Sequence, residues 1–401
     1  MTAPISDDQA VTPELPGKAR VVIIGAGLIG SSIACQMGRM GITEVVVLEK
    51  GRIGAQGATA HCVGGLRTQF STAINVRYSL ASRRIFRNFA DEFGVSLDFS
   101  PDGYLFLADS SARWRTLQQT ARLMAQLETP VELLTPGEVS RRWPFLQGAP
   151  GMGASYTRED GFYGPMEVLQ AFVADARKRG VRFYEQTEVA GIKANGCQVT
   201  GVRTASGATI EAEAIVNAAG PWAGRVAALA GVDLPVQPLQ RHLFLTGPCE
   251  PLPAVFPMIF NLDSGWYLKR EGAGLLLGGP TAKKSFSDQM DYNAEEWTAC
   301  ESMRHVPLLD QTVIVRGWIG HYEVTPDHHA VIGAFPERGN FVCAAGFSGH
   351  GFQHSPVAGR LVAELIAQGQ TRSEDIFPLR PTRFRENCLI DEPMTAFRAE
   401  S

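Results

Sequence analysis

Residues 21–30, VVIIGAGLIG, are the feature that most restricts what this chain can fold into. Four apolar residues lead into a glycine turn, which the helix-like run SSIACQMGRMG and the strand-like run EVVVLEK follow. Gly25 allows a tight turn, Gly27 leaves room for a pyrophosphate, and Gly30 lets the helix lie close to the strand. Free N–H groups and the positive dipole at the helix start favour phosphate. The pattern predicts a dinucleotide-binding fold.

An acidic residue, Glu49, stands at the end of the second strand-like run. A carboxylate there accepts the hydrogen bonds of a ribose diol and disfavours a 2′-phosphate. The expected ligand is therefore an adenine dinucleotide without that phosphate, which leaves FAD and NAD to be separated.

Residues 341–367 favour FAD over NAD. A short apolar strand runs into GFSGHG, and we expect a helix after it, with Ser355 as N-cap and Pro356 at the first helical position. N–H groups aligned at a helix start stabilise the negative charge that reduction places on an isoalloxazine ring. A further small-residue turn lies in EAEAIVNAAGPWA, residues 211–223. An ordinary βα turn explains each element alone, but the three together indicate FAD.

Composition agrees with a two-domain enzyme. The chain has 401 residues, is 45% hydrophobic and carries a net charge of −4, so neither nucleic acid nor a basic membrane surface is an expected partner. The first 20 residues carry acids and prolines, and no apolar run approaches the ~20 residues of a membrane span. Seven scattered cysteines without a CxxC pair suit reduced thiols, so we expect a cytoplasmic protein without a metal site. The oligomeric state stays open.

The glycine elements are far apart, so the nucleotide domain is expected to be discontinuous. Alternating strand patterns such as HLFLT and GLLLGG, with many Pro and Gly turns, lie between its pieces. We expect an α/β fold (α+β overall) in which a Rossmann-like FAD-binding domain is joined to an antiparallel-sheet substrate domain. The predicted division is FAD-binding domain 18–95, 150–228 and 326–375, substrate domain 96–149 and 229–325, and tails 1–17 and 380–401.

The chain resembles the D-amino-acid oxidase and glycine/sarcosine oxidase superfamily over about residues 20–370. The matching stretches are VVIIGAGLIGSSIACQMGRMG, LEKGRIGAQGAT, EDGFYGP, IVNAAGPWAG, EVTPDHHAVIG and AAGFSGHGFQHSP. The resemblance implies FAD and oxidation of the C–H bond beside the nitrogen of a secondary or N-methylated amino acid, or a related amine. Hydride transfer to flavin N5 gives an imine, which water hydrolyses, and O2 or another acceptor reoxidises the flavin.

Two other functions stay open on the same scaffold. One is oxidation of a 2-hydroxy acid. The other is an FAD-holding assembly or partner-binding protein without turnover, because VGGLRTQFS resembles a mitochondrial subgroup implicated in assembling respiratory complex I. Anaerobic bleaching of the flavin by candidate substrates separates an enzyme from an assembly protein.

The motifs and the resemblance together place twenty residues at the cofactor. They are Gly25, Gly27, Leu28, Ile29, Gly30, Glu49, Lys50, Ala58, Thr59, His61, Val189, Ala219, Gly220, Trp222, Gly346, Gly349, His350, Gly351, Phe352 and Gln353.

Several positions depart from the family pattern. Gly320 corresponds to the cysteine that carries the flavin in monomeric sarcosine oxidase, so that linkage is excluded. His61 corresponds to the flavin-bearing histidine of dimethylglycine dehydrogenase, but we expect noncovalent FAD with His61 as a hydrogen-bonded imidazole. Leu276 replaces a lysine that assists oxygen reduction, and Lys269 reaches that place only by another loop path. Gln353 replaces a lysine that holds the substrate carboxylate in some members.

Four residues are the catalytic candidates. Arg67 is expected to bind a carboxylate through a bidentate fork, or else to hold the flavin ring or a backbone carbonyl. Tyr267 and Tyr322 are expected as aromatic walls for an amine, or else as core rings. His321 is a candidate base that keeps the amine neutral.

The spacing of His350 and His354 suggests a metal pair, and His328 and His329 add to the impression. Gly351 and the expected helix start at Ser355 separate the first two, and no acid or cysteine stands beside them at ligand spacing. We therefore expect no metal.

Overall fold

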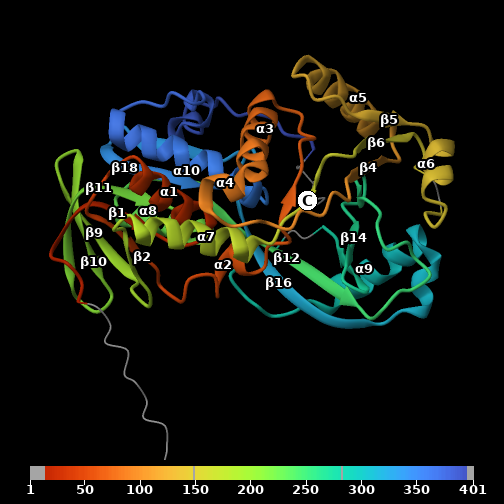
Figure 1. Ribbon diagram of the computed structural model, residues 1–401, viewed down its shortest axis with the longest axis horizontal. Helices are drawn as coiled ribbons and strands as arrows, with labels where there is room; N and C mark the ends of the chain where they lie inside the picture. Colours follow the sequence, from red (N-terminus) through yellow and green to blue (C-terminus); the bar gives the residue numbers. More distant parts are fainter. Residues whose placement is uncertain (1–13, 148–149, 281–282, 395–401) are drawn as a thin grey trace, which may run out of the picture.

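The computed structural model describes residues 14–147, 150–280 and 283–394. It contains two large sheets that lie side by side, each built from segments far apart in the sequence (Figure 1). None of the helices within these ranges is long and apolar enough to cross a membrane.

The first sheet is the predicted nucleotide fold. Five neighbouring strands are parallel, and their order is β18 (Arg338–Ala345), β11 (Thr209–Asn217), β1 (Lys18–Ile24), β2 (Val45–Leu48) and β8 (Arg182–Tyr184). Three strands are antiparallel to their neighbours: β17 (Val331–Phe335), which pairs with β18, and the meander β9 (Val189–Asn195) and β10 (Gln198–Thr204), which attaches to β11. The discontinuous assembly expected from the separated glycine elements is therefore observed.

Both faces of β1 are buried because its side chains alternate between two cores. Val21 and Ile23 pack in one core with three helices: α1 (Leu28–Arg39), α7 (Pro165–Lys178) and α10 (Gly351–Gln368). Val22 and Ile24 pack in the other with α8 (Ala223–Leu229) and the β9–β10 meander. The continuous apolar run of β1 is thus explained by two-sided covering.

The second sheet carries the inserted strands. Its order is β16 (Ile314–Val324), β12 (Gln237–Thr246), β15 (Gly274–Gly278), β14 (Tyr267–Glu271), β13 (Met258–Asn261), β4 (Tyr104–Ala108), β6 (Gly153–Thr157) and β5 (Glu132–Leu134). Every neighbouring pair is antiparallel except β13 and β4, which are parallel, so the sheet is mixed. Residues 153–157, which we assigned to the nucleotide domain, form β6 here because their hydrogen-bond partners are β4 and β5.

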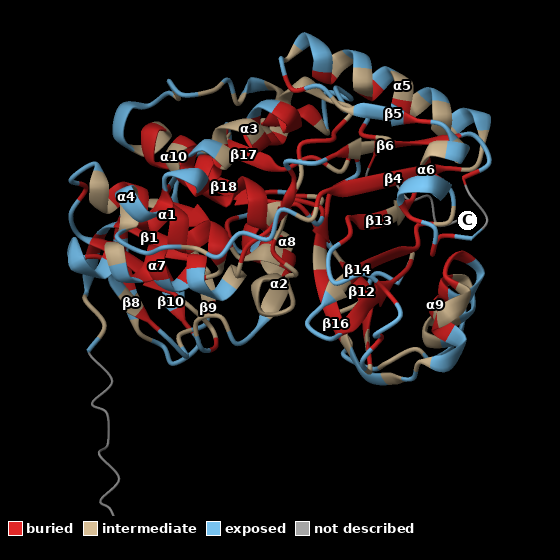
Figure 2. Cartoon of the chain, turned by 45° about the vertical axis from the view of Figure 1, so that its right-hand side comes forward, coloured by how far each residue is buried: buried red, intermediate tan, exposed pale blue. Residues whose placement is uncertain are grey.

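The remaining elements cover the two sheets. The short strands β3 (Gly65–Leu66) and β7 (Gly161–Phe162) form a third, two-stranded sheet. Figure 2 shows buried strands inside and exposed outer surfaces on the peripheral helices α5 and α9. The helices not yet named are α2 (Gly57–Ala60), α3 (Ala73–Arg87), α4 (Phe89–Phe93), α5 (Ser111–Gln126), α6 (Pro136–Arg142) and α9 (Tyr292–His305).

Helix α10 begins earlier than the sequence predicted. It starts at Gly351 with His350 as its N-cap residue, so Ser355 is not the N-cap and Pro356 lies inside the helix. Pro356 has no N–H for the carbonyl of Phe352, but the Ser355 hydroxyl donates to that oxygen at 2.8 Å. The proline is tolerated because its missing hydrogen bond is replaced.

The last described residues are not a free polar tail. Arg383 is fully buried and donates from Nε and Nη2 to the Asp327 carboxylate at 2.8 and 2.9 Å. The segment therefore belongs to the folded body. The predicted tails 1–17 and 380–401 fall partly on residues 1–13 and 395–401, which lie outside the described part of the chain.

Candidate active site

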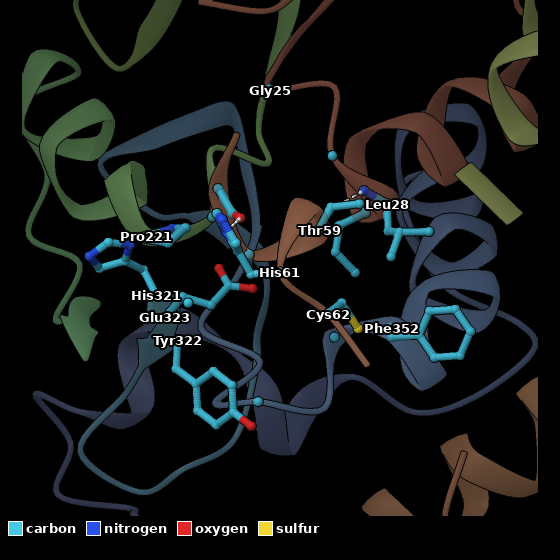
Figure 3. Close-up of a pocket in the computed structure, with 18 of the residues that line it drawn as sticks. Gly25, Leu28, Thr59, His61, Cys62, Pro221, His321, Tyr322, Glu323 and Phe352 are labelled. Carbon is cyan, nitrogen blue, oxygen red and sulfur yellow. Dashed lines mark hydrogen bonds between the residues drawn. The ribbon is translucent and has the colours of Figure 1, made fainter. Parts of the chain in front are cut away.

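A cavity of about 670 Å³ lies between the two sheets. Twenty-two of the twenty-four predicted site residues line it, and Figure 3 shows part of that lining. Gly30 and Gly346 do not, because each packs against other parts of the protein. A Cβ on Gly30 would stand 1.9 Å from the Gly25 carbonyl oxygen, so Gly30 allows close helix–strand packing as predicted.

One end of the cavity has the features of a dinucleotide cradle. Gly25 has a φ of +102°, which favours glycine, and Gly27 is the N-cap residue of α1. The Leu28 N–H donates to the Thr59 hydroxyl at 3.2 Å. Backbone donors at the start of α1 thus face a space bounded by small residues, as a pyrophosphate requires.

Glu49 lines the same end of the cavity and fixes the glycine turn. Its carboxylate oxygens accept from the N–H groups of Ala26 and Gly51, each at 2.9 Å. The Lys50 ammonium lies 3.0 Å from the ring centroid of Trp222. Burial lowers the pKa of Lys50. The predicted ribose-binding acid is therefore in place beside an aromatic and a cationic group.

The glycine run before α10 forms another wall. Gly349 has a φ of +95°, and a Cβ there would stand 2.3 Å from the Tyr322 ring. His350 is buried, and its Nε2 atom lies 3.2 Å from the His328 carbonyl oxygen. Its Nδ1 atom has no hydrogen-bond partner among the described residues. A buried polar atom at a cavity wall needs a partner, and a flavin fits here because its ring carries both donors and acceptors.

His61 and Gly320, the two positions that correspond to covalent flavin attachment in similar enzymes, are neighbours in the cavity wall. The Cβ of His61 lies 3.3 Å from the place where a Cβ on Gly320 would stand. The Nδ1 atom of His61 lies 3.1 Å from the Gly57 carbonyl oxygen. The glycine brings no sulfur, and the imidazole is held by the turn of α2.

Three catalytic candidates meet at the other end of the cavity. Arg67 is partly buried, and its guanidinium carbon lies 4.0 Å from the Phe70 ring centroid. Its Nη1 atom donates to the Gln69 carbonyl at 2.6 Å, so the backbone-binding alternative is partly realised. Arg67 forms no ion pair with any residue in the described ranges. Burial lowers the pKa of this arginine, which remains a cation at neutral pH.

Tyr267 and Tyr322 line the cavity near this cation. Burial raises the pKa of both phenols, so they stay protonated at neutral pH. They thus provide aromatic faces and neutral hydroxyl groups at the cavity wall.

Gln353 does not present a free amide to a ligand. Its Oε1 atom accepts from the Arg67 N–H at 2.9 Å, and its Nε2 atom donates to the Ser79 hydroxyl at 3.0 Å. Although it lines the cavity, this side chain holds the Arg67 backbone in place. Its predicted place at the cofactor cavity is kept, while its amide group is bonded to protein partners.

His321 reaches the cavity apart from Tyr322. The two are consecutive in β16, so their side chains leave opposite sides of the strand, and Figure 3 shows them pointing in different directions. The His321 ring lies beside Phe286, with 6.3 Å between the ring centroids, and its Nε2 atom is 3.3 Å from the Ser287 carbonyl oxygen. A role as base at the amine therefore has no geometric support.

Leu276, which stands where a lysine assists oxygen reduction in related enzymes, lies outside the cavity lining. Leu276 is buried and does not line the cavity; it is the cross-strand partner of Lys269. The Lys269 ammonium is 2.6 Å from Glu271 and 4.4 Å from the Phe162 ring centroid. Its charge is thus paired away from the cavity.

Several lining residues were missed by sequence reasoning. They are Tyr104, Phe106, Arg241, Met258, Phe260, Glu323 and Met394. Tyr104 and Phe106 lie in β4, a continuous apolar run whose sequence does not reveal which face lines the cavity. The tail around Met394 gave no signal at all.

Glu323, near the end of β16, is a buried carboxyl group that reaches the turn before α10. It accepts from the Gly346 N–H at 3.0 Å. Burial raises its pKa to about 7, against the lowering effect of the backbone donors of Gly346 and Phe347. Its charge therefore changes near neutral pH.

His350, in the glycine run, and His354, in α10, pack as aromatic rings. His350 and His354 have centroids 5.1 Å apart, and both rings contact Phe70. Burial lowers the pKa of His354 to about 3. Across the described ranges, no group of three or more His, Cys, Asp or Glu side chains is arranged to hold a metal ion.

Comparisons with known proteins agree with this geometry. Residues 20–365 match the family model described as "FAD dependent oxidoreductase". FAD-dependent oxidoreductase domain-containing protein 1 of Xenopus laevis is 30% identical, with 95% of this chain and 86% of that protein covered. Glycine oxidase of Geobacillus kaustophilus is 28% identical, with 90% and 96% covered. The crystal structure of L-proline dehydrogenase from P. horikoshii is 31% identical and superposes with a TM-score of 0.86, with 94% and 100% covered.

Proposed function

Because the chain belongs to the DAO family of FAD-dependent oxidoreductases, with FAD as its cofactor, we propose that it oxidises a secondary or N-methylated amino acid beside the amine nitrogen. L-Proline, the substrate named for one similar structure, is a secondary amino acid. Glycine, named for another relative, is a primary one. The amino acid class is therefore common to both, and the substituted amine is our narrower proposal.

The observation that carries the proposal is Arg67. It is a partly buried cation at the cavity wall, and no described residue forms an ion pair with it. Burying an unpaired charge is costly, so a carboxylate that enters the cavity gains both charge pairing and a hydrogen bond. A substrate with a carboxylate suits this site better than a simple amine.

Aromatic faces at the same end suit the rest of the substrate. Tyr267 and Tyr322 are neutral rings that line the cavity beside Arg67. They exclude water from the reacting carbon and pack against an N-methyl group or a pyrrolidine ring. When bound, FAD supplies a two-electron acceptor for the hydride from that carbon. The imine product is hydrolysed by water.

The proposal is tested by anaerobic mixing of the holoenzyme with a substrate panel, and the measurement is the loss of visible flavin absorbance. L-Proline, N-methylglycine and N-methylalanine are expected to bleach the flavin, and glycine less. Matched 2-hydroxy acids, such as lactate and glycolate, are the comparison set. Bleaching by the hydroxy acids alone would assign the other chemistry, and a flavin that no compound reduces would refute turnover.

A further inference from the structure

The C-terminal segment 383–394 reaches the substrate end of the cavity. Met394 is fully buried and lines the same cavity as Arg67. It packs in one apolar cluster with Phe106 and Tyr267, which also line the cavity. A segment distant in sequence from every glycine motif thus supplies part of the wall.

Phe106 lies near the Arg67 guanidinium and belongs to the same apolar cluster as Met394. The guanidinium carbon of Arg67 lies 5.5 Å from the ring centroid of Phe106. Phe106 in turn belongs to the cluster that contains Met394. Arg67 therefore contacts the apolar cluster to which Met394 belongs, and both residues line the cavity in which the remainder of a carboxylate substrate has to fit.

Glu392 holds this segment against the stretch that follows Arg67. Its carboxylate is 1% exposed and accepts from the Ser71 N–H at 2.8 Å, the Thr72 hydroxyl at 2.7 Å and the Asn75 amide at 3.0 Å. A buried carboxylate requires such donors, since its desolvation is otherwise uncompensated. The wall residue, two positions further on, is fixed by this network.

Further contacts restrain the segment on both sides of Glu392. The Ile390 N–H donates to Asp327 at 3.3 Å, and the same carboxylate pairs with Arg383. The Pro393 carbonyl accepts from Arg113, on α5, at 3.1 Å. Met394 is thus held between the nucleotide domain and a helix that covers the second sheet.

We propose that Met394 is a specificity-determining residue, whose side chain limits the size of the apolar group that a bound carboxylate can carry. Glu392 is the positioning residue that keeps Met394 in the wall. The inference rests on the proposed carboxylate site at Arg67, and it predicts a preference for small aliphatic amino acids.

Binding of unreactive carboxylates tests the inference without turnover. Acetate, 3-methylbutanoate and phenylacetate are titrated into the oxidised holoenzyme, and the shift of the flavin spectrum gives each Kd. Met394→Ala is expected to improve the Kd of phenylacetate relative to acetate about tenfold, because space for extra carbons is typically worth at least this factor. Met394→Trp is expected to change the ratio about tenfold in the opposite direction, and Met394→Leu to preserve it.

Other variants in segment 383–394 distinguish a specific effect of Met394 in the cavity wall from a general disturbance of the segment. Glu392→Ala is expected to shift the ratio in the same direction as Met394→Ala. Leu389→Ala and Glu386→Ala alter exposed residues of the segment and are expected to leave it unchanged. A ratio that stays within twofold in both Met394→Ala and Met394→Trp overturns the inference, as does a wild type that binds none of the carboxylates.

The same variants show whether the inference or the proposed function has failed. If the variants oxidise amines but keep the wild-type ratio of the Kd values of phenylacetate and acetate, the role of Met394 is refuted and the proposed function stands. If the ratio shifts in a protein that oxidises no amine, the proposed function is refuted and the role of Met394 stands.

Discussion

The Cβ of His61 lies 3.3 Å from the point where a side chain on Gly320 would begin. The two positions that carry a covalent flavin in different members of this family are therefore adjacent in space. In this chain one is a glycine, and the other is an imidazole held by the Gly57 carbonyl. A side chain at position 320 would press against His61, and glycine itself offers no sulfur for a thioether.

From this arrangement we predict that the FAD is noncovalent. Acid precipitation of the purified protein should release the yellow colour into the supernatant, which absorbance measures directly. Colour that remains in the pellet of wild type, and is lost from the pellet of His61→Ala, would instead identify His61 as an attachment site.

Glu49 is expected to contribute to FAD affinity through the ribose and through the glycine turn. Replacement by alanine removes an acceptor from the N–H groups of Ala26 and Gly51. We expect about tenfold weaker binding, since one hydrogen bond to a charged group is worth about 1.5 kcal/mol or more. Titration of the apoprotein with FAD gives the Kd, with exposed Glu128→Ala as the matched control. Equal affinity of wild type and Glu49→Ala would contradict the ribose assignment.

Arg67→Met is expected to raise the KM for amino acids by about 10- to 100-fold, because it removes a charged hydrogen bond worth roughly 1.5–3 kcal/mol. Arg67→Lys should recover only part of this loss, as an ammonium lacks the planar fork. Steady-state kinetics are the measurement, and the exposed Arg316→Met is the control. If amines without a carboxylate lose as much kcat/KM as amino acids do, Arg67 does not bind the carboxylate.

Stability is expected to depend on pH through Glu323. The unfolded carboxyl has a pKa of 4.5, and burial raises the folded value to about 7. The folded state then binds more protons between these values, so stability is full below pH 4.5 and is lost as pH rises to about 7. The loss is on the order of 3 kcal/mol relative to Glu323→Gln, which cannot titrate. Urea unfolding of flavin-free wild type and variant at pH 5 and pH 8 measures it, and parallel pH profiles would contradict the shift.

Reoxidation by oxygen is expected to be slow in the wild-type enzyme and faster with an artificial dye or quinone. Leucine at position 276 supplies no cation, and the charge of Lys269 is paired with Glu271. Neither residue lines the cavity, so neither places a positive charge beside the flavin. Stopped-flow reoxidation of the reduced enzyme by air-saturated buffer and by the dye measures the difference. Wild type that reoxidises as fast with oxygen as with the dye would contradict the expectation.

The parts of this molecule that sequence predicted are those in which neighbouring residues determine the outcome. Gly25, Gly27 and Gly30 act within one turn, so VVIIGAGLIG revealed its strand, turn and helix without knowledge of the rest. The start of α10 was misjudged at Ser355 because a hydroxyl contact with Phe352 compensates for Pro356. In the sequence, a serine before a proline looks the same whether it is the N-cap or compensates for the proline inside a helix.

The residues that sequence could not place depend on distant partners. His321 and Tyr322 differ only in which side of β16 they leave, and that is decided by pairing with β12. Residues 153–157 join the second sheet through β4 and β5. Met394 lies at the cavity because Glu392 finds donors more than 300 positions earlier, as the separation of 317 from Asn75 shows.

The interleaved strand order also determines how late in translation the first sheet can be completed. Strand β1 needs β11 as its hydrogen-bonded neighbour, and β11 needs β18, which the ribosome makes only after the whole inserted sheet. During most of translation the nascent chain therefore carries unpaired strand edges, the kind of surface that chaperones cover. FAD loading becomes a late event, so a ribosome stalled before β18 should display a chain that binds no flavin.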